Sequence, residues 1–401
     1  MKDNKDKLRH LPKLDLNNQN FSTKSEKVKS ARNNYWCART PFGLAILSYR
    51  QVGSLLRDRR LRQGSYSWPA SQKASGSFAS FWQRCIISQE GEPLKRLRKL
   101  SLSALDENFV KSLKPQFDTI AKILCNNLRK TNKCEFQSAF SIPFSGRAIC
   151  TLLDLPQEKW RDISLDASTL GLAMGINYKF HEKKINAACD RLMILADELI
   201  RACEKGDKKN GLVFRLVSEA YNNQKVTHQD LLDLIVILIF GGVDTTRSQL
   251  GFLMALFDKY PSQWSLLKNN HDLVSSAIEE GIRAWPTTTW VTREANQTFE
   301  YEGIKIKKGT TLHLLVHSSA KDPALGELPD FDIKKKQRAH HGFGGGAHYC
   351  LGHFVARTDM ACALKAIVKT IKNFHIEGNP HYLPDSGNTS PEFLPLKYVL
   401  E

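Results

Sequence analysis

Between Val110 and about Tyr260, apolar side chains recur mostly at intervals of three and four residues. This spacing places them on one face of an α-helix, and it extends over more than a third of the chain. The alternation of strands and helices that a doubly wound parallel sheet requires is not visible in the sequence. The sequence therefore predicts a protein built mainly from packed helices.

One segment of this region, residues 227–259, reads THQDLLDLIVILIFGGVDTTRSQLGFLMALFDK. It opens with Thr227-x-x-Asp230, the pattern of a capping box, and predicts a helix about 45 Å long. Gly241 and Gly242 each cost roughly 1 kcal/mol against alanine in a helix, and the Asp-Thr-Thr that follows interrupts the apolar face. Either the helix is kinked here, with a threonine bonded back to a carbonyl one turn earlier, or the interruption serves a function.

A minor β part is predicted towards both ends of the chain. Residues 299–316 alternate with period two and turn at Gly303 and Gly309, which predicts a small sheet. The region around residues 43–50 alternates in the same way, and helical spacing returns over residues 351–374. The predicted fold class is mainly α with a minor β part.

The N-terminal residues 1–34 are polar and basic and contain no apolar run. We expect them to form a flexible segment, and neither a secretory signal nor a membrane anchor. The longest apolar run, LLDLIVILIF, is too short to span a bilayer and contains an aspartate. Nine scattered cysteines without a C-x-x-C pair indicate reduced thiols. These features predict a soluble, cytoplasmic, monomeric protein.

A glycine-rich stretch, RAHHGFGGGAHYCLGHFVAR, occupies residues 338–357, and four interpretations compete for it. GFGGGA fits a loose dinucleotide fingerprint, but no strand precedes it and no βαβ unit surrounds it. His340, His341, His348 and Cys350 could bind zinc, yet their spacing matches no common zinc pattern. The third interpretation is a glycine-rich turn with a buried, inert cysteine. The fourth is a thiolate ligand, because glycines let the backbone approach a flat cofactor and the next helix's N-terminus stabilises charge on the sulfur.

The fourth interpretation carries a resemblance to a known family. FGGGAHYCLG matches F-G-x-G-x-H-x-C-x-G, the haem-binding signature of the cytochrome P450 family, with Phe343, Gly344, Gly346, His348, Cys350 and Gly352 in register. The resemblance implies haem b, iron protoporphyrin IX, with Cys350 as its axial thiolate ligand and metal ligand. It also implies that Phe343 packs beside the sulfur and that His348 pairs with a haem propionate.

From about Phe42 onward the chain resembles the soluble bacterial branch of this family. The resemblance implies the cytochrome P450 fold, a large helical region plus a small β-rich region around a buried haem, with residues 35–401 as a single catalytic domain. Glu280-x-x-Arg283 resembles the family's buried structural pair, which locks the loop that holds the ligand. Arg98 and Arg293 stand where the family has arginines that bind the propionates.

The sequence departs from the family pattern at three positions. Leu94 stands where many bacterial members have a histidine that contacts a propionate. Lys335 takes the position of an arginine that usually completes a triad with the Glu-Arg pair, and Ala320 replaces a common asparagine. The first two departures put one propionate contact and the third member of the triad in doubt.

GGVDTT, residues 241–246, resembles the family's oxygen-binding helix motif, A/G-G-x-D/E-T-T. The resemblance makes Thr245 the alcohol and Asp244 the acid of a relay that delivers protons to bound O₂. It implies a monooxygenase that inserts one oxygen atom into a small lipophilic substrate, by hydroxylation or epoxidation. The alternatives are a peroxide-driven peroxygenase, a branch that typically lacks the Asp-Thr pair, and a non-catalytic haem-thiolate sensor or carrier, which needs no relay.

The formal net charge of +17 favours an acidic partner or surface. The basic residues are not interleaved with aromatics, so we expect no nucleic-acid partner. Lys95, Arg96 and Lys99 flank Arg98 on a predicted helix. By resemblance this helix lies over the thiolate side of the haem, where a basic patch would attract a separate ferredoxin or flavodoxin, supplied by its reductase. The alternative is a merely solvated surface.

The substrate pocket is predicted from three segments with apolar side chains and a few hydroxyls. The first is the helix face before and at the glycines, and the second follows Arg283; the third is the loop around residues 170–176. The candidate pocket residues of the first two segments are Ile237, Phe240, Gly241, Thr287, Thr288, Thr289 and Trp290. Such a lining suits a lipophilic molecule and does not distinguish a terpenoid, fatty acid, steroid, aromatic amino acid or polyketide.

Overall fold

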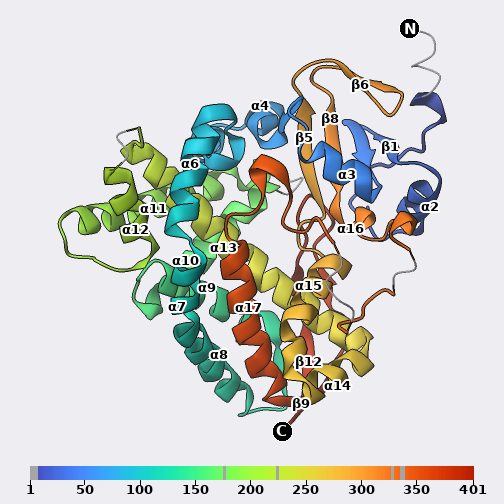
Figure 1. Cartoon of the computed structure of the whole chain (residues 1–401). Helices are drawn as coiled ribbons and strands as arrows, with labels where there is room; N and C mark the ends of the chain where they lie inside the picture. The colour runs from blue at the N-terminus through green and yellow to red at the C-terminus, as the bar shows by residue number, and fades with distance from the viewer. Residues whose placement is uncertain (1–7, 175–177, 223–224, 327–328, 335–338) are drawn as a thin grey trace.

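The structure, a computed structural model, describes residues 8–174, 178–222, 225–326, 329–334 and 339–401. Figure 1 shows that helices make up the larger part of the molecule. The main sheet lies in a smaller part, beside the N-terminal end of the chain. This arrangement confirms the predicted fold class, mainly α with a minor β part.

The helices of the larger part lie on both sides of one long helix in sequence. Those before it are α4 (Trp68–Ser71), α5 (Ser77–Arg84), α6 (Gly91–Ala104), α7 (Glu107–Ser112), α8 (Lys114–Leu128), α9 (Ile142–Leu152), α10 (Trp160–Gly171), α11 (Tyr178–Glu204) and α12 (Gly211–Tyr221). The long helix is α13 (His228–Lys259), and after it come α14 (Pro261–Asn269), α15 (Val274–Ala284) and α17 (His353–Val368). In the smaller part lie α2 (Glu26–Asn34), α3 (Tyr49–Leu55) and α16 (Val316–Ser319), which packs against both of them.

The strands of the described residues form one five-stranded sheet and three smaller sheets. The five-stranded sheet has the order β1 (Cys37–Thr40), β2 (Gly43–Ile46), β8 (Thr311–Leu315), β5 (Trp290–Ala295) and β3 (Leu61–Gln63). The other sheets are β4 (Lys133–Glu135), β12 (Pro395–Leu400) and β9 (Ile371–Ile376); β6 (Phe299–Tyr301) with β7 (Ile304–Ile306); and β10 (His381–Tyr382) with β11 (Pro391–Phe393). Because β8 pairs with both β2 and β5, the main sheet joins early and late parts of the chain.

The small sheet predicted for residues 299–316 forms only in part. Gly303 makes the turn of the hairpin between β6 and β7, as predicted. After Gly309, however, β8 leaves this hairpin and pairs with β5 and β2. Gly309 has φ +81°, and its N–H donates to the carbonyl of Ala295 at 2.8 Å, so the turn directs β8 back along β5.

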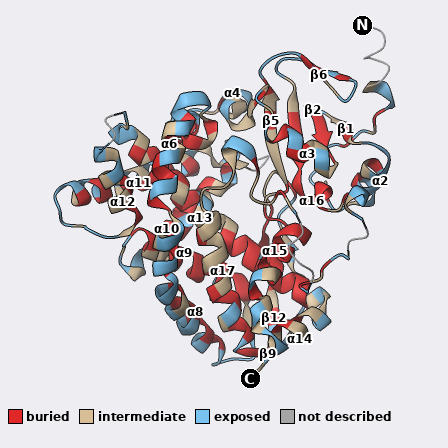
Figure 2. Ribbon diagram, viewed as in Figure 1, coloured by how far each residue is buried: buried red, intermediate tan, exposed pale blue. Residues whose placement is uncertain are grey.

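Helix α13 is continuous over its whole predicted length, through both glycines. Its first turn has the predicted capping box: Thr227 Oγ1 accepts from the Asp230 N–H at 3.1 Å, and the Asp230 carboxylate accepts from the Thr227 N–H at 2.9 Å. Almost every residue from Thr246 to Phe257 is buried, because α9, α10, α15 and α17 pack around the helix. Figure 2 shows buried residues gathered where α13, α15 and α17 meet.

The prediction of a flexible segment over residues 1–34 is wrong for the part that the structure describes, from Leu8 onward. Residues 26–34 form α2, and Leu14, Leu16 and Val28 are buried in a core cluster with residues of β1, β2 and β8. Leu14 also donates its N–H to the carbonyl of Arg39 at 2.9 Å. The leucines are isolated among polar residues, so no periodic pattern marks them, and only packing against a distant sheet buries them.

The last helix is shorter than the sequence predicts. Helical spacing continues to about residue 374, but α17 ends at Val368 and the chain continues as β9. Strand β9 pairs with β12, from the end of the chain, which provides hydrogen bonds that no local pattern can signal. Within the described ranges, no helix combines the length and the apolar character needed to cross a bilayer.

Candidate active site

The glycine-rich stretch folds into a tight loop directly before α17. Gly344 and Gly346 have φ +73° and +66°, in the left-handed region that favours glycine. A Cβ on Gly346 would lie 2.7 Å from the carbonyl oxygen of Leu56, so the loop also approaches α3 too closely for any side chain. The Cys350 N–H donates to the carbonyl of Phe343 at 2.9 Å and closes the loop. The glycines therefore set the position of the cysteine.

Cys350 lies three residues before the first residue of α17, among groups that favour a negative charge on sulfur. Burial raises the pKa of its thiol above the ordinary value, and the Gly352 N–H and the cations Arg357 and Arg98 offset only part of this rise. Arg98 on α6 donates to the carbonyl of Tyr349 at 2.8 Å, so this guanidinium sits beside the cysteine. The N–H donor and the two cations would stabilise the thiolate form once a metal is bound to the sulfur.

The histidines of this stretch do not converge on a zinc site. His340 Nε2 lies 3.1 Å from Glu279, His341 Nε2 donates to the carbonyl of Tyr49 at 3.3 Å, and His348 Nε2 lies 3.0 Å from Glu90. The three rings thus bind partners on three different segments. No group of three or more His, Cys, Asp or Glu side chains arranged for a metal ion occurs in the described part of the chain.

Two arginines fit the anionic propionates of a haem. Arg293 is only 3% exposed, and among the described residues it donates hydrogen bonds to Gln63 and to the carbonyl of Thr292. Burial lowers the pKa of Arg293 to about 10, so the guanidinium stays charged near neutral pH. Arg98, half-buried, also donates only to a carbonyl. Among the described residues, neither arginine forms an ion pair with a carboxylate, and a charge this buried calls for an anion.

The structure also describes the surroundings of His348 and Leu94. The resemblance implies that His348 pairs with a propionate, and in the structure its Nε2 lies beside Glu90, which also accepts the Gln63 N–H at 2.7 Å. Leu94 is buried in the main core cluster and offers no polar contact. Glu90 was not predicted, because a single exposed glutamate before a helix carries no signal in sequence.

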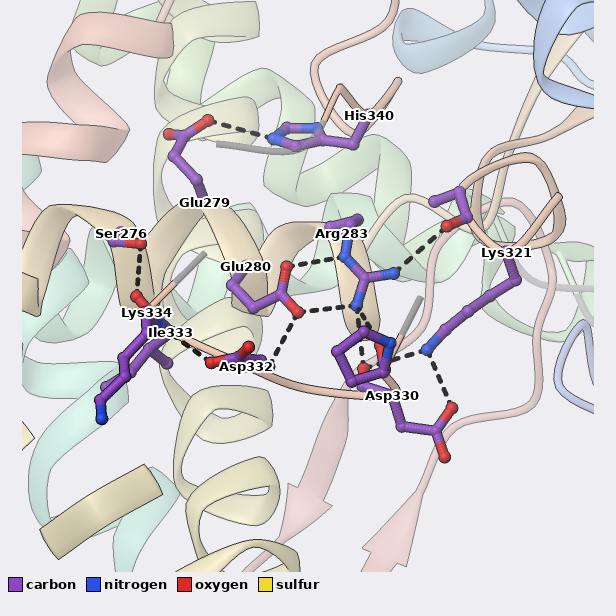
Figure 3. A network of polar contacts seen from close by, with 12 residues as sticks. Ser276, Glu279, Glu280, Arg283, Lys321, Asp330, Asp332, Ile333, Lys334 and His340 are labelled. Carbon is purple, nitrogen blue, oxygen red and sulfur yellow. Dashed lines mark hydrogen bonds and ion pairs between the residues drawn. The ribbon is translucent and has the colours of Figure 1, made fainter. Parts of the chain in front are cut away.

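Glu280 and Arg283 come together as a buried pair, shown in Figure 3. Both guanidinium–carboxylate hydrogen bonds are 2.7 Å long, and Arg283 is 1% exposed. Arg283 also donates to the carbonyls of Ala320, Pro329 and Asp330. The carbonyl of Ala320 thus contributes a contact that does not depend on its side chain. Lys335, the predicted third member of a triad, lies outside the described residues.

The pair forms hydrogen bonds with backbone groups of the segment after α16. In the described residues it does not contact the cysteine loop. Its neighbour Glu279 does: this carboxylate bonds to His340 in the loop and to Arg357 on α17. The sequence did not single out Glu279 or Arg357. Adjacent glutamates on a helix cannot be told apart without knowing which face each one presents.

The two glycines of α13 have different surroundings. A Cβ on Gly241 would meet nothing within 4 Å, whereas a Cβ on Gly242 would lie 2.5 Å from a methyl group of Ile149 on α9. A side chain at position 242 would therefore require the end of Ile149 to move. Gly241 leaves open space beside Thr245, which agrees with the predicted room for a small molecule at this turn of the helix.

Asp244 and Thr245 are held by contacts within α13. Arg247 donates to the Asp244 carboxylate from Nε at 2.9 Å and from Nη2 at 2.6 Å, and it also lies 3.7 Å from Glu392 on β11. The Thr245 hydroxyl donates to the carbonyl of Gly241. This bond back to the preceding turn is the one that the kink alternative requires, but the helix is not interrupted.

The predicted pocket residues separate into two groups. Ile237 and Phe240 lie in the main core cluster, where the Phe240 ring contacts Trp82 of α5 with 6.3 Å between centroids. Trp290 instead packs against Phe21 and His313, in the cluster that buries the N-terminal segment. Its ring is thus directed to a different core cluster from that of Phe240.

The threonines of the second predicted segment have separate contacts. Thr287 donates its N–H and hydroxyl to the side chain of Gln249 on α13, and Thr288 pairs with Asn388 in an isolated bridge. Thr289 is buried, and its hydroxyl has no hydrogen-bond partner among the residues that the structure describes. Of the third predicted segment, residues 175 and 176 lie outside the described residues.

A cysteine presented by a glycine loop at the start of a helix, with a second, buried helix carrying an acid and an alcohol, is an arrangement that haem-thiolate oxidoreductases use. The comparisons agree with this class. The family model described as Cytochrome P450 matches residues 263–394. Luteothin monooxygenase from Streptomyces thioluteus is 30% identical over 399 residues, which cover 97% of this chain and 96% of the relative.

Solved structures share the fold. The crystal structure of CalO2 has a TM-score of 0.87 at 20% identity and covers 95% of this chain and 99% of that one. The crystal structure of P450BioI in complex with an acyl carrier protein ligated to hexadec-9Z-enoic acid has a TM-score of 0.86 at 21% identity, covering 96% and 99%. The chain is an oxidoreductase of the monooxygenase class. It belongs to the cytochrome P450 family, which implies a haem-thiolate cofactor.

Proposed function

We propose that this P450 binds haem b through the thiolate of Cys350 and inserts one atom of O₂ into a small lipophilic substrate, by hydroxylation or epoxidation. The observation that carries the proposal is the setting of Cys350. A loop that only glycine can form presents the sulfur to an N–H donor and two cations. A buried, inert cysteine would need none of these groups.

The residues present fit the haem group. Cys350 would hold the iron, and Arg98 and Arg293 would hold the two propionates, because each is a buried or half-buried cation without a carboxylate partner among the described residues. Phe343 lies beside the cysteine loop with the Arg357 guanidinium 4.3 Å from its ring centroid. When bound, haem supplies the reduction of O₂ and the cleavage of its O–O bond.

The role of the chain in oxygen chemistry is to place protons. The Thr245 hydroxyl donates to the Gly241 carbonyl, which fixes the orientation of its oxygen and leaves the lone pairs of Oγ1 free to accept. Asp244 is adjacent in sequence and 15% exposed at its side chain, so its carboxylate can take a proton from solvent and pass it towards Thr245 Oγ1. In the structure, Arg247 holds this carboxylate through two hydrogen bonds.

The substrate would contact the apolar surface of α13 before Gly241. Ile237 and Phe240 are each 8% exposed and belong to the main core cluster, and Phe240 contacts Trp82. The open space beside Gly241 would bring a substrate carbon close to the oxygen site. An apolar lining of this kind favours a lipophilic compound.

Electrons would come from a separate ferredoxin or flavodoxin that docks near α6. Arg98 on this helix donates a hydrogen bond to the residue next to Cys350, and Lys99 is exposed and forms no ion pair within the described ranges. Lys95 forms only an exposed pair with Glu92, whereas Arg96 is engaged by Asp230 of α13 at 3.1 Å. The docking charge would therefore come from Lys95 and Lys99 more than from Arg96.

The test is spectroscopic and then catalytic. The purified, reduced protein should give the carbon monoxide absorption band of a thiolate-ligated haem, and Cys350→His should lose that band. A reduced ferredoxin system with lipophilic compounds should then drive consumption of NADPH and form an oxygenated product. Spectral shifts without turnover would indicate a sensor or carrier, and turnover with peroxide alone would indicate a peroxygenase.

A further inference from the structure

Glu279 directly precedes Glu280 on α15, and its carboxylate contacts the cysteine loop itself. Glu279 is 8% exposed, and its two oxygens bond to residues on two different segments. Figure 3 shows Glu279 pointing towards His340 and away from the pair formed by Glu280 and Arg283. Neighbouring residues on one helix thus support two different parts of the site.

The first partner of Glu279 is Arg357, which follows Cys350 by seven residues. Arg357 Nε donates to Oε1 of Glu279 at 2.6 Å and Nη2 donates to Oε2 at 3.1 Å, so the contact is bidentate. The guanidinium lies over the Phe343 ring, 4.3 Å from its centroid, and Nη1 is 3.0 Å from His353 Nδ1. Burial opposes the charge on Arg357, but the bonds to Glu279 raise its pKa.

The second partner of Glu279 is His340, at the start of the loop. The Gly342 N–H donates to His340 Nδ1 at 3.1 Å, so Nδ1 is an acceptor and the proton of the neutral ring is on Nε2. Nε2 therefore donates to Glu279, at 3.1 Å. Burial would raise the pKa of Glu279, but the donors His340 and Arg357 hold it at about 2, so this carboxylate is ionised.

We propose that Glu279 is a positioning residue that fixes the Arg357 guanidinium over Phe343 and, through it, sets the electrostatic environment of the Cys350 sulfur. Through His340, the same carboxylate anchors the start of the loop. The inference rests on the proposed ligand role of Cys350. It assigns Glu279 a part of its own beside the structural pair, whose contacts in the described residues include the segment after α16.

Because Glu279 and Arg357 carry opposite charges, their replacement should shift the midpoint potential in opposite directions. Replacing Glu279 by glutamine removes a negative charge and leaves the positive charge of Arg357 uncompensated near the sulfur. This change should make the midpoint potential of the bound iron more positive. Replacing Arg357 by glutamine should make it more negative, because Glu279 then stands alone. The double variant should return close to the wild-type value.

The experiment compares Glu279→Gln, Arg357→Gln and the double variant with wild type, each carrying haem. The midpoint potential is measured by spectroelectrochemistry, and the decay of the thiolate band of the reduced carbon monoxide complex is followed on warming. We expect opposite shifts of potential in the single variants. We also expect the Glu279→Gln decay to be about tenfold faster, which corresponds to the loss of one moderate coupling between neighbours.

The matched control is Asp166→Asn, which removes another buried carboxylate held by an arginine. Asp166 is 6% exposed and accepts three hydrogen bonds from Arg191, between α10 and α11. This variant should unfold at a lower temperature and leave the potential unchanged. Glu279→Asp keeps the charge, so it should hold the potential near the wild-type value even if its stability falls. If Glu279→Gln does not fold, the shift in Arg357→Gln carries the test.

Potentials that shift in the same direction in both single variants, or that do not shift in either, would overturn the inference. Such a result would leave Glu279 as a residue of general stability only. A wild-type protein without the thiolate band would instead refute the proposed function. The two failures are therefore distinguishable.

Discussion

Arg247 and Asp244 lie one turn apart on α13, and the guanidinium holds the carboxylate through two hydrogen bonds of 2.9 and 2.6 Å. Both side chains are largely buried, with 10% and 15% exposed. The acid of the proposed relay is thus restrained by a cation of its own helix. Glu392 on β11, 3.7 Å from Arg247, ties the C-terminal part of the chain to the same point.

This contact predicts the effect of Arg247→Gln. The change leaves the Asp244 charge without its partner in a mostly buried position, so the free energy of unfolding should fall by about 3 kcal/mol. Denaturant unfolding measures the difference. Glu392→Gln is the matched control: its carboxylate is 38% exposed and more distant, so the loss should stay below about 1 kcal/mol. Equal losses of unfolding free energy in the two variants would contradict the conclusion that Asp244 is the main partner of Arg247.

Thr245→Ala should keep the thiolate band but divert electrons from product to peroxide. The variant loses the γ-methyl group and the hydroxyl at which the relay delivers a proton, and the bond from that hydroxyl to Gly241 lies within the helix, so the fold should hold. The measurement is the ratio of product and peroxide to NADPH consumed. Thr245→Ser keeps the hydroxyl and should couple nearly as wild type. Full coupling in Thr245→Ala would remove the relay role.

Gly346→Ala should abolish most haem binding. The new Cβ would lie 2.7 Å from the Leu56 carbonyl oxygen and would sit on a residue with φ +66°, so the loop must move. Gly309→Ala separates the effect of backbone strain from that of steric overlap, because φ there is +81° and a Cβ meets nothing within 4 Å. That control should lose only about 1 kcal/mol of stability from backbone strain and keep its thiolate band. The measurement is the haem content per protein in the two variants, read from the absorption spectrum.

His317 predicts a pH dependence of stability. Burial lowers its pKa to about 3, from an ordinary value near 6.5, while its Nδ1 donates to the carbonyl of Thr23. Because the folded pKa is below the unfolded one, the contribution is complete above about pH 6.5 and is lost as the pH falls towards 3. Each pH unit in this window should cost about 1.4 kcal/mol.

Comparison of wild type with His317→Asn between pH 6 and 5 tests this expectation. Asparagine keeps a donor near the position of Nδ1 but does not titrate, so the slope of unfolding free energy against pH should be smaller by about 1.4 kcal/mol per unit. His381→Asn, an exposed position, should leave the slope unchanged. An unaltered slope in His317→Asn would show that the buried ring does not govern this window.

The elements that were predicted correctly are those whose signals are local. The capping box and helical spacing of α13 need only residues a few positions apart, and both formed as expected. The N-terminal leucines and the strand β9 were misassigned, because their structure depends on pairing with residues far away in the chain. Propensity and period do not contain that information.

The same division applies to the site. The sequence by itself determined the cysteine, its glycines and the acid–alcohol pair, since each motif spans at most ten residues and short spacing is preserved in any fold. Only the tertiary structure decided that Glu279 reaches His340 and Arg357 around the cysteine loop, that Arg247 holds Asp244 and that His348 meets Glu90. Glu279 and Arg357 are 78 residues apart, and packing of α15 against α17 brings them together. Long-range packing, which decides the partner of each charge, is the part that a one-dimensional pattern cannot encode.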